Sequence, residues 1–140
     1  SPNVTSIEEI GLAAQDGGAD AVSAINTVMG MSVDIKSKKP RLSTIMGGLS
    51  GPCIKPVALA NIYKLFKSLD IPIIGIGGIS NCDDVIEFML TGARFIELGT
   101  INYKYPNLVE NLTDELQNYL EQQSITHIKD IVGDLMIEDK

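Results

Sequence analysis

The sequence predicts an α/β protein built on a parallel sheet that is covered by helices. Short, almost wholly apolar segments alternate with longer segments whose apolar residues recur at helical spacing, which is the order of βα units. The apolar segments lack the alternation of a half-exposed strand, so we expect strands that are buried on both faces. Glycines or small polar residues close nearly every segment and mark the element boundaries.

The first predicted unit is a helix followed by a buried strand. Thr5 and Glu8 have the spacing of a capping box, in which a hydroxyl and a carboxylate satisfy the first backbone N–H groups. The helix is expected to end near Asp16, where a Gly–Gly pair permits a left-handed stop. The apolar run 19–25 is then predicted to form the first strand.

The segment 26–53 is predicted to be a long, irregular connection. It contains several glycines and a basic cluster, which comprises Lys36, Lys38, Lys39 and Arg41. A connection of this length in a compact domain usually has a function. The basic cluster is interpreted as a solvated loop, with contact to a partner or ligand as the alternative.

The second half repeats the alternation of helix and strand. The predicted elements are a helix from Pro56 to Leu69, a strand 71–76, a helix from a cap at 80–81 to Thr91, a strand 94–98, a loop with Tyr103 and Tyr105, a helix 107–122 and a short segment 126–131. The helix 107–122 should direct Val109, Leu112, Leu116, Tyr119 and Leu120 inward. Residues 138–140 are expected to be frayed.

Composition excludes several classes of protein. The net charge of −7 argues against nucleic acid or an anionic membrane as partner. The sequence contains no run of about 18 apolar residues, so we expect no membrane-spanning helix. The two cysteines and the one histidine lack metal-ligand spacing, so we expect no metal site. With only two cysteines we also expect no disulfide framework, and this cysteine usage fits a reducing cytoplasm. The first residues lack a signal-peptide pattern and an initiator methionine, so we expect the chain to begin within a longer protein or after processing.

Glycines follow the second and third predicted strands and indicate a phosphate site. Gly77-Gly78 and Gly99-Thr100 stand at the carboxyl ends of these strands, which meet at the same edge of a parallel sheet. Consecutive backbone N–H groups at such exits bind anions without any lysine or arginine. A plain turn explains each exit taken singly, whereas two successive exits favour the phosphate site.

Other polar residues allow two interpretations each. Asn26 and Thr27 follow the first predicted strand and suit a planar ligand with alternating N–H and C=O edges, or form an Asx turn. No pair of nucleophile and base is visible. Cys53 and Cys82 are interpreted as packed or incidental thiols, and His127 as a surface residue.

A set of motifs resembles one family. The motifs are Ile25-Asn26-Thr27, Gly30-Met31, Gly47-Gly48-Leu49-Ser50-Gly51-Pro52, Ile54-Lys55-Pro56, Ile73-Ile74-Gly75-Ile76-Gly77-Gly78-Ile79 and Gly99-Thr100. In this order they resemble the dihydroorotate dehydrogenase family, most closely its class 1B catalytic subunit, from Ser1 to about Gly133. The related domain of dihydropyrimidine dehydrogenase shares several of these features.

The resemblance implies a fold and a flavin site. With 140 residues, the chain is well short of the roughly 250 residues of a complete TIM (β/α)8 barrel. It would supply the C-terminal portion of one, about strands 6–8 with helices 5–8: residues 1–133 would form a partial FMN-binding barrel and 134–140 a tail. The implied FMN contacts are Ile25, Gly51, Gly77, Gly78, Gly99 and Thr100. The implied substrate contacts are Asn26 and Thr27.

The implied activity is oxidation of dihydroorotate to orotate in de novo pyrimidine biosynthesis. Hydride would pass from C6 to flavin N5 while a base removes the C5 proton. In class 1B this base is a cysteine upstream of the segment 1–5, and neither Cys53 nor Cys82 matches it. A flavin-contacting lysine that precedes the same segment is also missing. No catalytic residue is therefore assigned to this chain, which we expect to be inactive alone.

The resemblance also implies partners. These are the N-terminal part of the same barrel, a second copy, and an electron-transfer subunit that carries FAD and an iron–sulfur cluster and reduces NAD. Two alternatives remain open: a non-catalytic fragment that binds flavin or phosphate, and a different FMN enzyme that resembles dihydropyrimidine dehydrogenase. Two open edges of a three-stranded sheet should promote association of the isolated chain.

Overall fold

A parallel sheet forms the centre of the structure, a computed structural model that describes residues 1–137. The sheet has three strands, β1 (Val22–Ala24), β6 (Ile73–Gly75) and β7 (Phe95–Ile96), in the order β1-β6-β7. Both pairs of neighbours are parallel. The prediction of a parallel α/β sheet is confirmed, although each strand is shorter than its apolar run.

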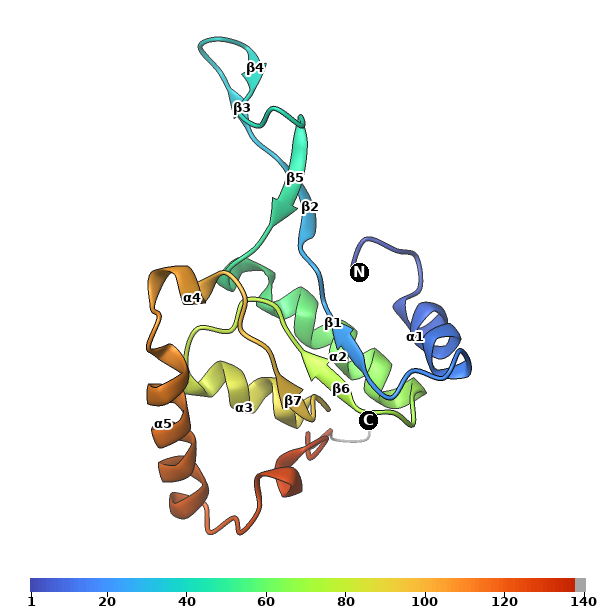
Figure 1. The fold of residues 1–140 in the computed structure, drawn as a ribbon, viewed down its shortest axis with the longest axis vertical. Helices are drawn as coiled ribbons and strands as arrows, with labels where there is room; N and C mark the ends of the chain where they lie inside the picture. The colour runs from blue at the N-terminus through green and yellow to red at the C-terminus, as the bar shows by residue number, and fades with distance from the viewer. Residues whose placement is uncertain (138–140) are drawn as a thin grey trace.

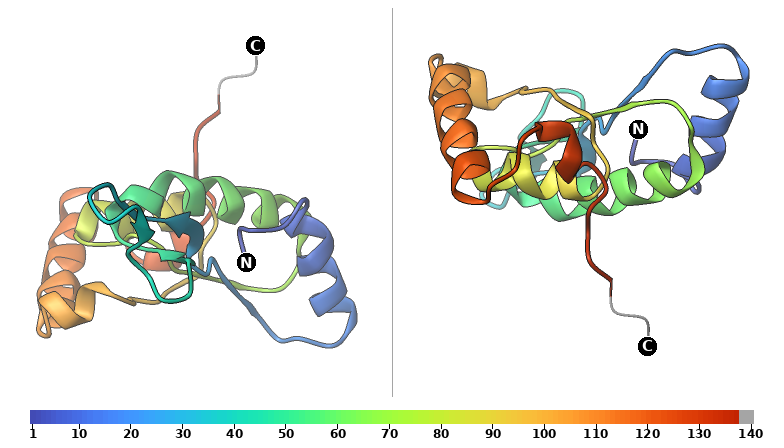
Figure 2. Two further views of the ribbon diagram at one scale, coloured as in Figure 1. Left: turned by 90° about the horizontal axis from the view of Figure 1, so that it is seen from above. Right: turned by 90° about the horizontal axis from the view of Figure 1, so that it is seen from below.

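Helices flank the sheet (Figures 1 and 2). They are α1 (Ile7–Asp16), α2 (Lys55–Ser68), α3 (Cys82–Leu90), α4 (Ile101–Lys104) and α5 (Leu108–Gln122), with short 3-10 turns η1 (Pro52–Ile54) and η2 (Ile128–Ile131). The helix α2 contacts β1 and β6, and α3 contacts β7. The predicted helices are therefore present with boundaries shifted by at most a few residues.

Side-chain caps determine where two helices begin. The cap of α1 is Ser6, whose hydroxyl accepts a hydrogen bond from the Glu9 backbone N–H at 3.2 Å. The predicted cap at Thr5 was one residue early: two adjacent hydroxyl residues offer a cap here, and serine is the preferred N-cap of the two. In α3 the Asn81 side chain accepts a hydrogen bond from the Asp84 N–H at 2.9 Å, as the cap predicted at 80–81 requires.

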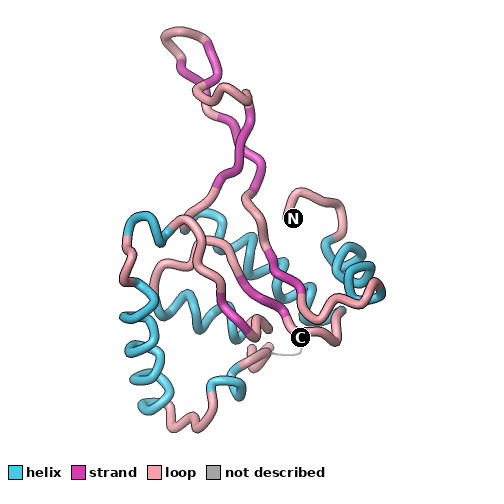
Figure 3. Tube along the Cα trace, viewed as in Figure 1, coloured by secondary structure: helices cyan, strands magenta, loops and turns pink. Residues whose placement is uncertain are grey.

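The segment 26–53 is an ordered arm, so the prediction of an irregular connection was wrong. Its strands β2 (Val28–Met31) and β5 (Met46–Leu49) pair antiparallel, and β3 (Val33–Asp34) pairs with β4 (Lys39–Pro40) beyond them. The arm projects away from the sheet and helices (Figures 1 and 3). Glycine is depleted in strands, and the glycines within β2 and β5 concealed this pairing in the sequence. The basic cluster is exposed near the end of the arm.

The region after β7 differs from its prediction in two places. The expected loop that contains Tyr103 forms the short helix α4. Along α5, Leu112 is buried and Leu116 and Tyr119 pack against the core, but Val109 is 56% exposed and does not point inward. The helix α5 contacts α3, so only a narrow stripe of its surface is covered. The predicted fraying of 138–140 concerns residues outside the described part of the chain.

The two faces of the sheet have different surroundings. Ala24, Ile73 and Gly75 lie in the core on the face that α2 and α3 cover. The opposite face carries Ser23 and Phe95, which are both exposed, Phe95 by 53%. Parallel sheets are normally covered on both faces, so this part of the chain leaves an apolar surface uncovered.

Within residues 1–137, no helix combines the length and the apolar character that crossing a membrane requires.

Candidate functional site

A cavity of about 900 Å³ lies at the carboxyl ends of the three parallel strands. Its wall includes every residue that the sequence singled out for a ligand. These are Ile25, Asn26, Thr27, Gly51, Gly77, Gly78, Gly99 and Thr100. The residues come from four separate loops, so the tertiary structure brings together contacts that are up to 75 positions apart in the chain (Ile25 to Thr100).

Two of these loops present free backbone donors. Within the described residues, the N–H groups of Gly77, Gly78, Gly99 and Thr100 donate no hydrogen bond to a protein acceptor. Backbone N–H groups that lack a protein partner require water or a ligand. Successive free N–H groups in a turn form a concave anion site, so this part of the wall suits a phosphate.

Glycine is required at one of these exits and optional at the other. Gly77 and Gly78 have φ values of +136° and +80°, which only glycine adopts without strain. A Cβ atom on Gly78 would lie 2.7 Å from the Gly51 carbonyl oxygen and 2.9 Å from the Lys55 backbone nitrogen. A Cβ atom on Gly99 would meet only Ile76, at 3.7 Å. The fold therefore leaves room for a side chain at Gly99, and glycine there gives a ligand closer access to the backbone.

A hydroxyl pair connects two loops of the cavity wall. The Thr100 Oγ1 donates a hydrogen bond to Ser50 Oγ at 3.1 Å, and Ser50 immediately precedes Gly51. The sequence predicted a contact for Thr100 but not for Ser50, because the partners are separated by 50 positions.

Asn26 and Thr27 form a local hydrogen bond and also line the cavity. The Asn26 Oδ1 accepts a hydrogen bond from the Thr27 backbone N–H at 2.7 Å, which is a local contact of the Asx type. Both residues also line the cavity. The local contact occupies the amide oxygen of Asn26 and leaves its Nδ2 without a protein acceptor among residues 1–137.

Asn3 supports this loop from the N-terminal segment. Its Nδ2 donates to the Thr27 carbonyl at 2.9 Å, and its Oδ1 accepts from the Met29 N–H at 2.9 Å. Sequence reasoning missed this role. The only signal was a polar side chain beside Pro2 in a segment without periodicity, which is too weak to identify a contact 24 positions away.

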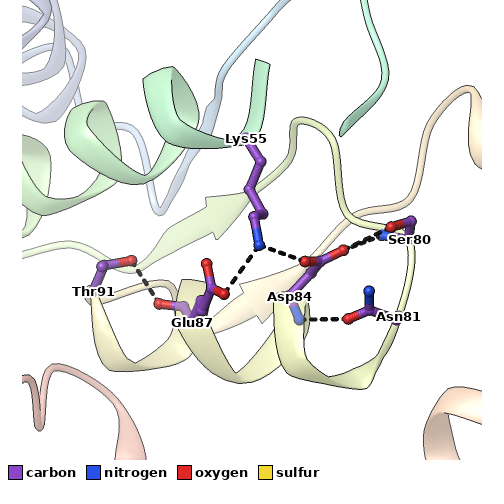
Figure 4. Close-up of polar contacts among 6 residues, drawn as sticks. All are labelled: Lys55, Ser80, Asn81, Asp84, Glu87 and Thr91. Carbon is purple, nitrogen blue, oxygen red and sulfur yellow. Dashed lines mark hydrogen bonds and ion pairs between the residues drawn. The ribbon is translucent and has the colours of Figure 1, made fainter. Parts of the chain in front are cut away.

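A charged network lies beside the cavity (Figure 4). Lys55 Nζ is 2.6 Å from Asp84 Oδ1 and 3.0 Å from Glu87 Oε1. Burial raises the pKa of the Asp84 carboxyl, but hydrogen bonds from Lys55 and Ser80 outweigh burial, so this pKa lies below its usual range. The hydrogen bonds to Asp84 and then Glu87 raise the pKa of Lys55. Sequence reasoning missed this pair, whose partners are 29 positions apart. The one available signal was a carboxylate four residues before Phe88 on the predicted helix 80–91.

The cavity wall also contains residues that the sequence did not single out. Ser23 Oγ donates a hydrogen bond to Glu97 Oε2 at 2.9 Å on the uncovered face of the sheet. Lys104 is the single lysine or arginine in the described wall, and its Nζ lies 5.0 Å from the centre of the Tyr105 ring. Their spacing carries no motif, so only the fold reveals them.

The cysteines and the histidine lie outside the described cavity wall. Cys82 is buried, and burial, followed by the charges of Glu115 and Asp83, raises the pKa of its thiol. Cys53 is exposed but does not line the cavity, and His127 is exposed at the start of η2. The described residues contain no group of three histidine, cysteine or carboxylate side chains that could hold a metal ion.

Comparison with known proteins identifies the same family as the motifs. A family model described as dihydroorotate dehydrogenase matches residues 1–120. The dihydroorotate dehydrogenase B (NAD(+)) catalytic subunit of Parabacteroides distasonis is 49% identical over 138 residues, which are 99% of this chain and 45% of that relative. The subunit of the same name from Bacteroides thetaiotaomicron is 47% identical over 137 residues, 98% of this chain and 45% of the relative.

A third relative has a similar identity and coverage. The corresponding subunit of Caldicellulosiruptor saccharolyticus is 45% identical over 137 residues, which cover 98% of this chain and 46% of that relative. The chain thus spans about half the length of the curated relatives it matches. With the model match and these identities together, the chain belongs to the dihydroorotate dehydrogenase family.

Proposed function

We propose that the chain forms the C-terminal portion of a (β/α)8 barrel, about strands 6–8 with helices 5–8, in residues 1–133, and that 134–140 is a tail. The strand order β1-β6-β7 follows the chain order, as it does around a barrel. The exposed face that carries Ser23, Phe95 and Glu97 would become the barrel interior. The N-terminal portion of the barrel would pair with the open edges β1 and β7.

The cavity is proposed to hold FMN. The observation that carries this proposal is the set of free backbone N–H groups at Gly77, Gly78, Gly99 and Thr100. They would bind the phosphate, because N–H groups in successive glycine turns match the oxygens of a phosphate. The side chain of Ile25 is buried in the same wall and would contact the apolar part of the flavin, together with the backbone of Gly51.

The proposed reaction is oxidation of dihydroorotate to orotate in de novo pyrimidine biosynthesis. FMN, when bound, supplies a hydride acceptor for this chemistry. Asn26 would donate from Nδ2 to a carbonyl of the pyrimidine ring, and the Thr27 hydroxyl would bond to the same ring edge. Their role is to hold the substrate in one orientation, which lowers the barrier by positioning.

The proton-abstracting base would come from the rest of the barrel. Neither Cys53 nor Cys82 lines the described cavity, and the Cys82 thiol is buried with a raised pKa. We therefore propose that the chain is active only in the complete barrel, in which it follows its N-terminal portion. A second copy and an electron-transfer subunit with FAD, an iron–sulfur cluster and NAD complete the proposed assembly, in the cytoplasm.

The test compares the chain alone with the complete barrel. Each is titrated with FMN, and the bound flavin absorbance is followed after addition of dihydroorotate or dihydrouracil. Bleaching of the complete barrel by dihydroorotate supports the proposal. FMN binding without bleaching by either compound would favour a non-catalytic fragment, and bleaching by dihydrouracil alone would favour an enzyme that resembles dihydropyrimidine dehydrogenase.

A further inference from the structure

We infer that Lys55, Asp84 and Ser80 form a clamp that sets the position of the Gly77–Gly78 loop relative to the Gly51 loop. Lys55 and Asp84 are then positioning residues for the phosphate of the cofactor, although neither lines the described cavity. The inference rests on the FMN site proposed above.

The clamp connects the start of α2 to the loop after β6 (Figure 4). Asp84 uses both carboxylate oxygens: Oδ1 lies 2.6 Å from Lys55 Nζ, and Oδ2 accepts from the Ser80 N–H and from the Ser80 hydroxyl, each at 2.8 Å. Ser80 stands two residues after Gly78. The position of the Asp84 carboxylate therefore determines where the glycine loop ends.

Burial makes this connection stiff. Asp84 is 4% exposed and is the one charged or polar side chain among residues 1–137 that is buried. A buried carboxylate without a partner is costly, so it stays where Lys55 and Ser80 satisfy it. Glu87 is 44% exposed at its side chain and can exchange its contact with Lys55 for water, so it contributes little to the geometry.

A second contact lies at the other end of the same loop. The Gly78 backbone fits so closely against the Gly51 carbonyl and the Lys55 N–H that a Cβ atom would overlap both, at 2.7 and 2.9 Å. The glycine loop is thus held at Gly78 by direct backbone contact and at Ser80 through Asp84. Because hydrogen bonds weaken steeply when donors turn away from the acceptor, a shift of Ser80 would misalign the free N–H groups of the loop.

This role has a signature that a general effect on folding lacks. The clamp acts on the loop that would hold the phosphate, so its loss should weaken FMN, which carries the phosphate, and spare riboflavin, which lacks it. A purely structural role would weaken both flavins by the same factor.

The experiment measures the Kd of FMN and of riboflavin by flavin fluorescence in the complete barrel and its variants. In Lys55→Met and Asp84→Asn we expect the FMN affinity to fall about tenfold, the effect of a lost charge-assisted hydrogen bond. The riboflavin affinity should stay within about twofold, the size of a neutral surface change. Lys55→Arg, which keeps the charge, should recover part of the FMN affinity.

Lys64→Met is the matched control. It removes a lysine from the same helix, α2, whose Nζ lies 3.8 Å from a Glu8 oxygen and remote from the cavity wall, and it should change neither flavin. If Lys55→Met fails to fold, Ser80→Ala removes one of the two bonds to Asp84 and leaves the ion pair intact. It should lower the FMN affinity about threefold and leave riboflavin unchanged.

Two results would overturn the clamp: equal losses for both flavins, or no loss of FMN affinity in any of the variants. A wild-type protein that binds FMN no better than riboflavin would instead refute the proposed phosphate site and, with it, the clamp. The two failures are distinguishable because the first appears only in the variants and the second already in the unmodified protein.

Discussion

The amide side chain of Asn3 binds the backbone of Thr27 across 24 positions of the chain, with Nδ2 2.9 Å from the Thr27 carbonyl oxygen. The same side chain accepts the N–H of Met29. Asn3 thereby determines the path of the chain where it leaves the sheet and enters the arm, and Asn26 and Thr27 lie on that path.

Replacement of Asn3 by alanine should loosen this loop. We expect faster hydrogen exchange at the Met29 N–H, which loses its acceptor, and an orotate affinity that is lower by about threefold in the complete barrel, the effect of one lost hydrogen bond. Exchange is measured by NMR and orotate binding by calorimetry. Asn61→Ala is the control, since among residues 1–137 the Asn61 side chain bonds only to the Val57 carbonyl within α2. Unchanged exchange at Met29 would contradict the role of Asn3.

Gly78→Ala should destabilise the protein more than Gly18→Ala. Both glycines have left-handed φ values, +80° and +89°, so both substitutions carry a backbone strain of about 1–2 kcal/mol. A Cβ atom on Gly18 meets nothing within 4 Å, whereas one on Gly78 overlaps backbone atoms of Gly51 and Lys55, which adds about 1–3 kcal/mol. Urea unfolding of the two variants measures the difference. Equal free energies of unfolding would show that the loops do not touch at Gly78.

Acid should weaken the wild-type protein through Asp84. The folded-state pKa of this carboxyl lies below its ordinary value, so the ion pair with Lys55 stabilises the fold fully above the unfolded pKa of about 4. The contribution disappears as the pH falls through the lower, folded-state pKa. At pH 7 we expect Asp84→Asn to lower the free energy of unfolding by about 1.5–3 kcal/mol, the range for a hydrogen bond to a charged group.

The comparison is made by urea unfolding of wild type and Asp84→Asn at a series of pH values from neutral to strongly acidic. The gap between the two proteins should narrow as the pH falls below the unfolded pKa of about 4, because protonation then favours the unfolded wild type. It should be smallest below the lower, folded-state pKa of Asp84, where both folded proteins carry an uncharged side chain at this position. A gap that stays constant with pH would mean that the charge of Asp84 does not stabilise the fold.

The two cysteines should react at very different rates. Cys53 is exposed, whereas Cys82 is buried and its thiol pKa is raised, so few thiolates form there. A thiol reagent such as iodoacetamide should label Cys53 in the native protein and Cys82 only after unfolding. Mass spectrometry of the labelled peptides measures this order. Cys53→Ser should abolish the fast reaction, and rapid native labelling of Cys82 would refute its burial.

Local pattern was sufficient for the elements of the sheet. The apolar runs around Ile73 and Phe95 and the glycines after α1 and α3 are contiguous signals, and helix caps act over three residues, so they could be read one segment at a time. The strands of the arm were not predicted, because they contain glycines and because they pair residues that are far apart in the sequence, such as Val28 and Leu49. Nothing within either strand specifies that partner.

In the candidate site, too, some features follow from local sequence and others only from the tertiary structure. The sequence by itself determined that glycines end neighbouring strands, Gly77-Gly78 and Gly99-Thr100, and parallel strands bring such ends to one edge. Only the tertiary structure decided that Gly78 needs glycine and Gly99 does not, and that Lys55 reaches Asp84 over 29 positions. The physical reason is range: backbone preference acts between neighbours, whereas steric fit and the pairing of a buried charge depend on where the whole chain places distant atoms.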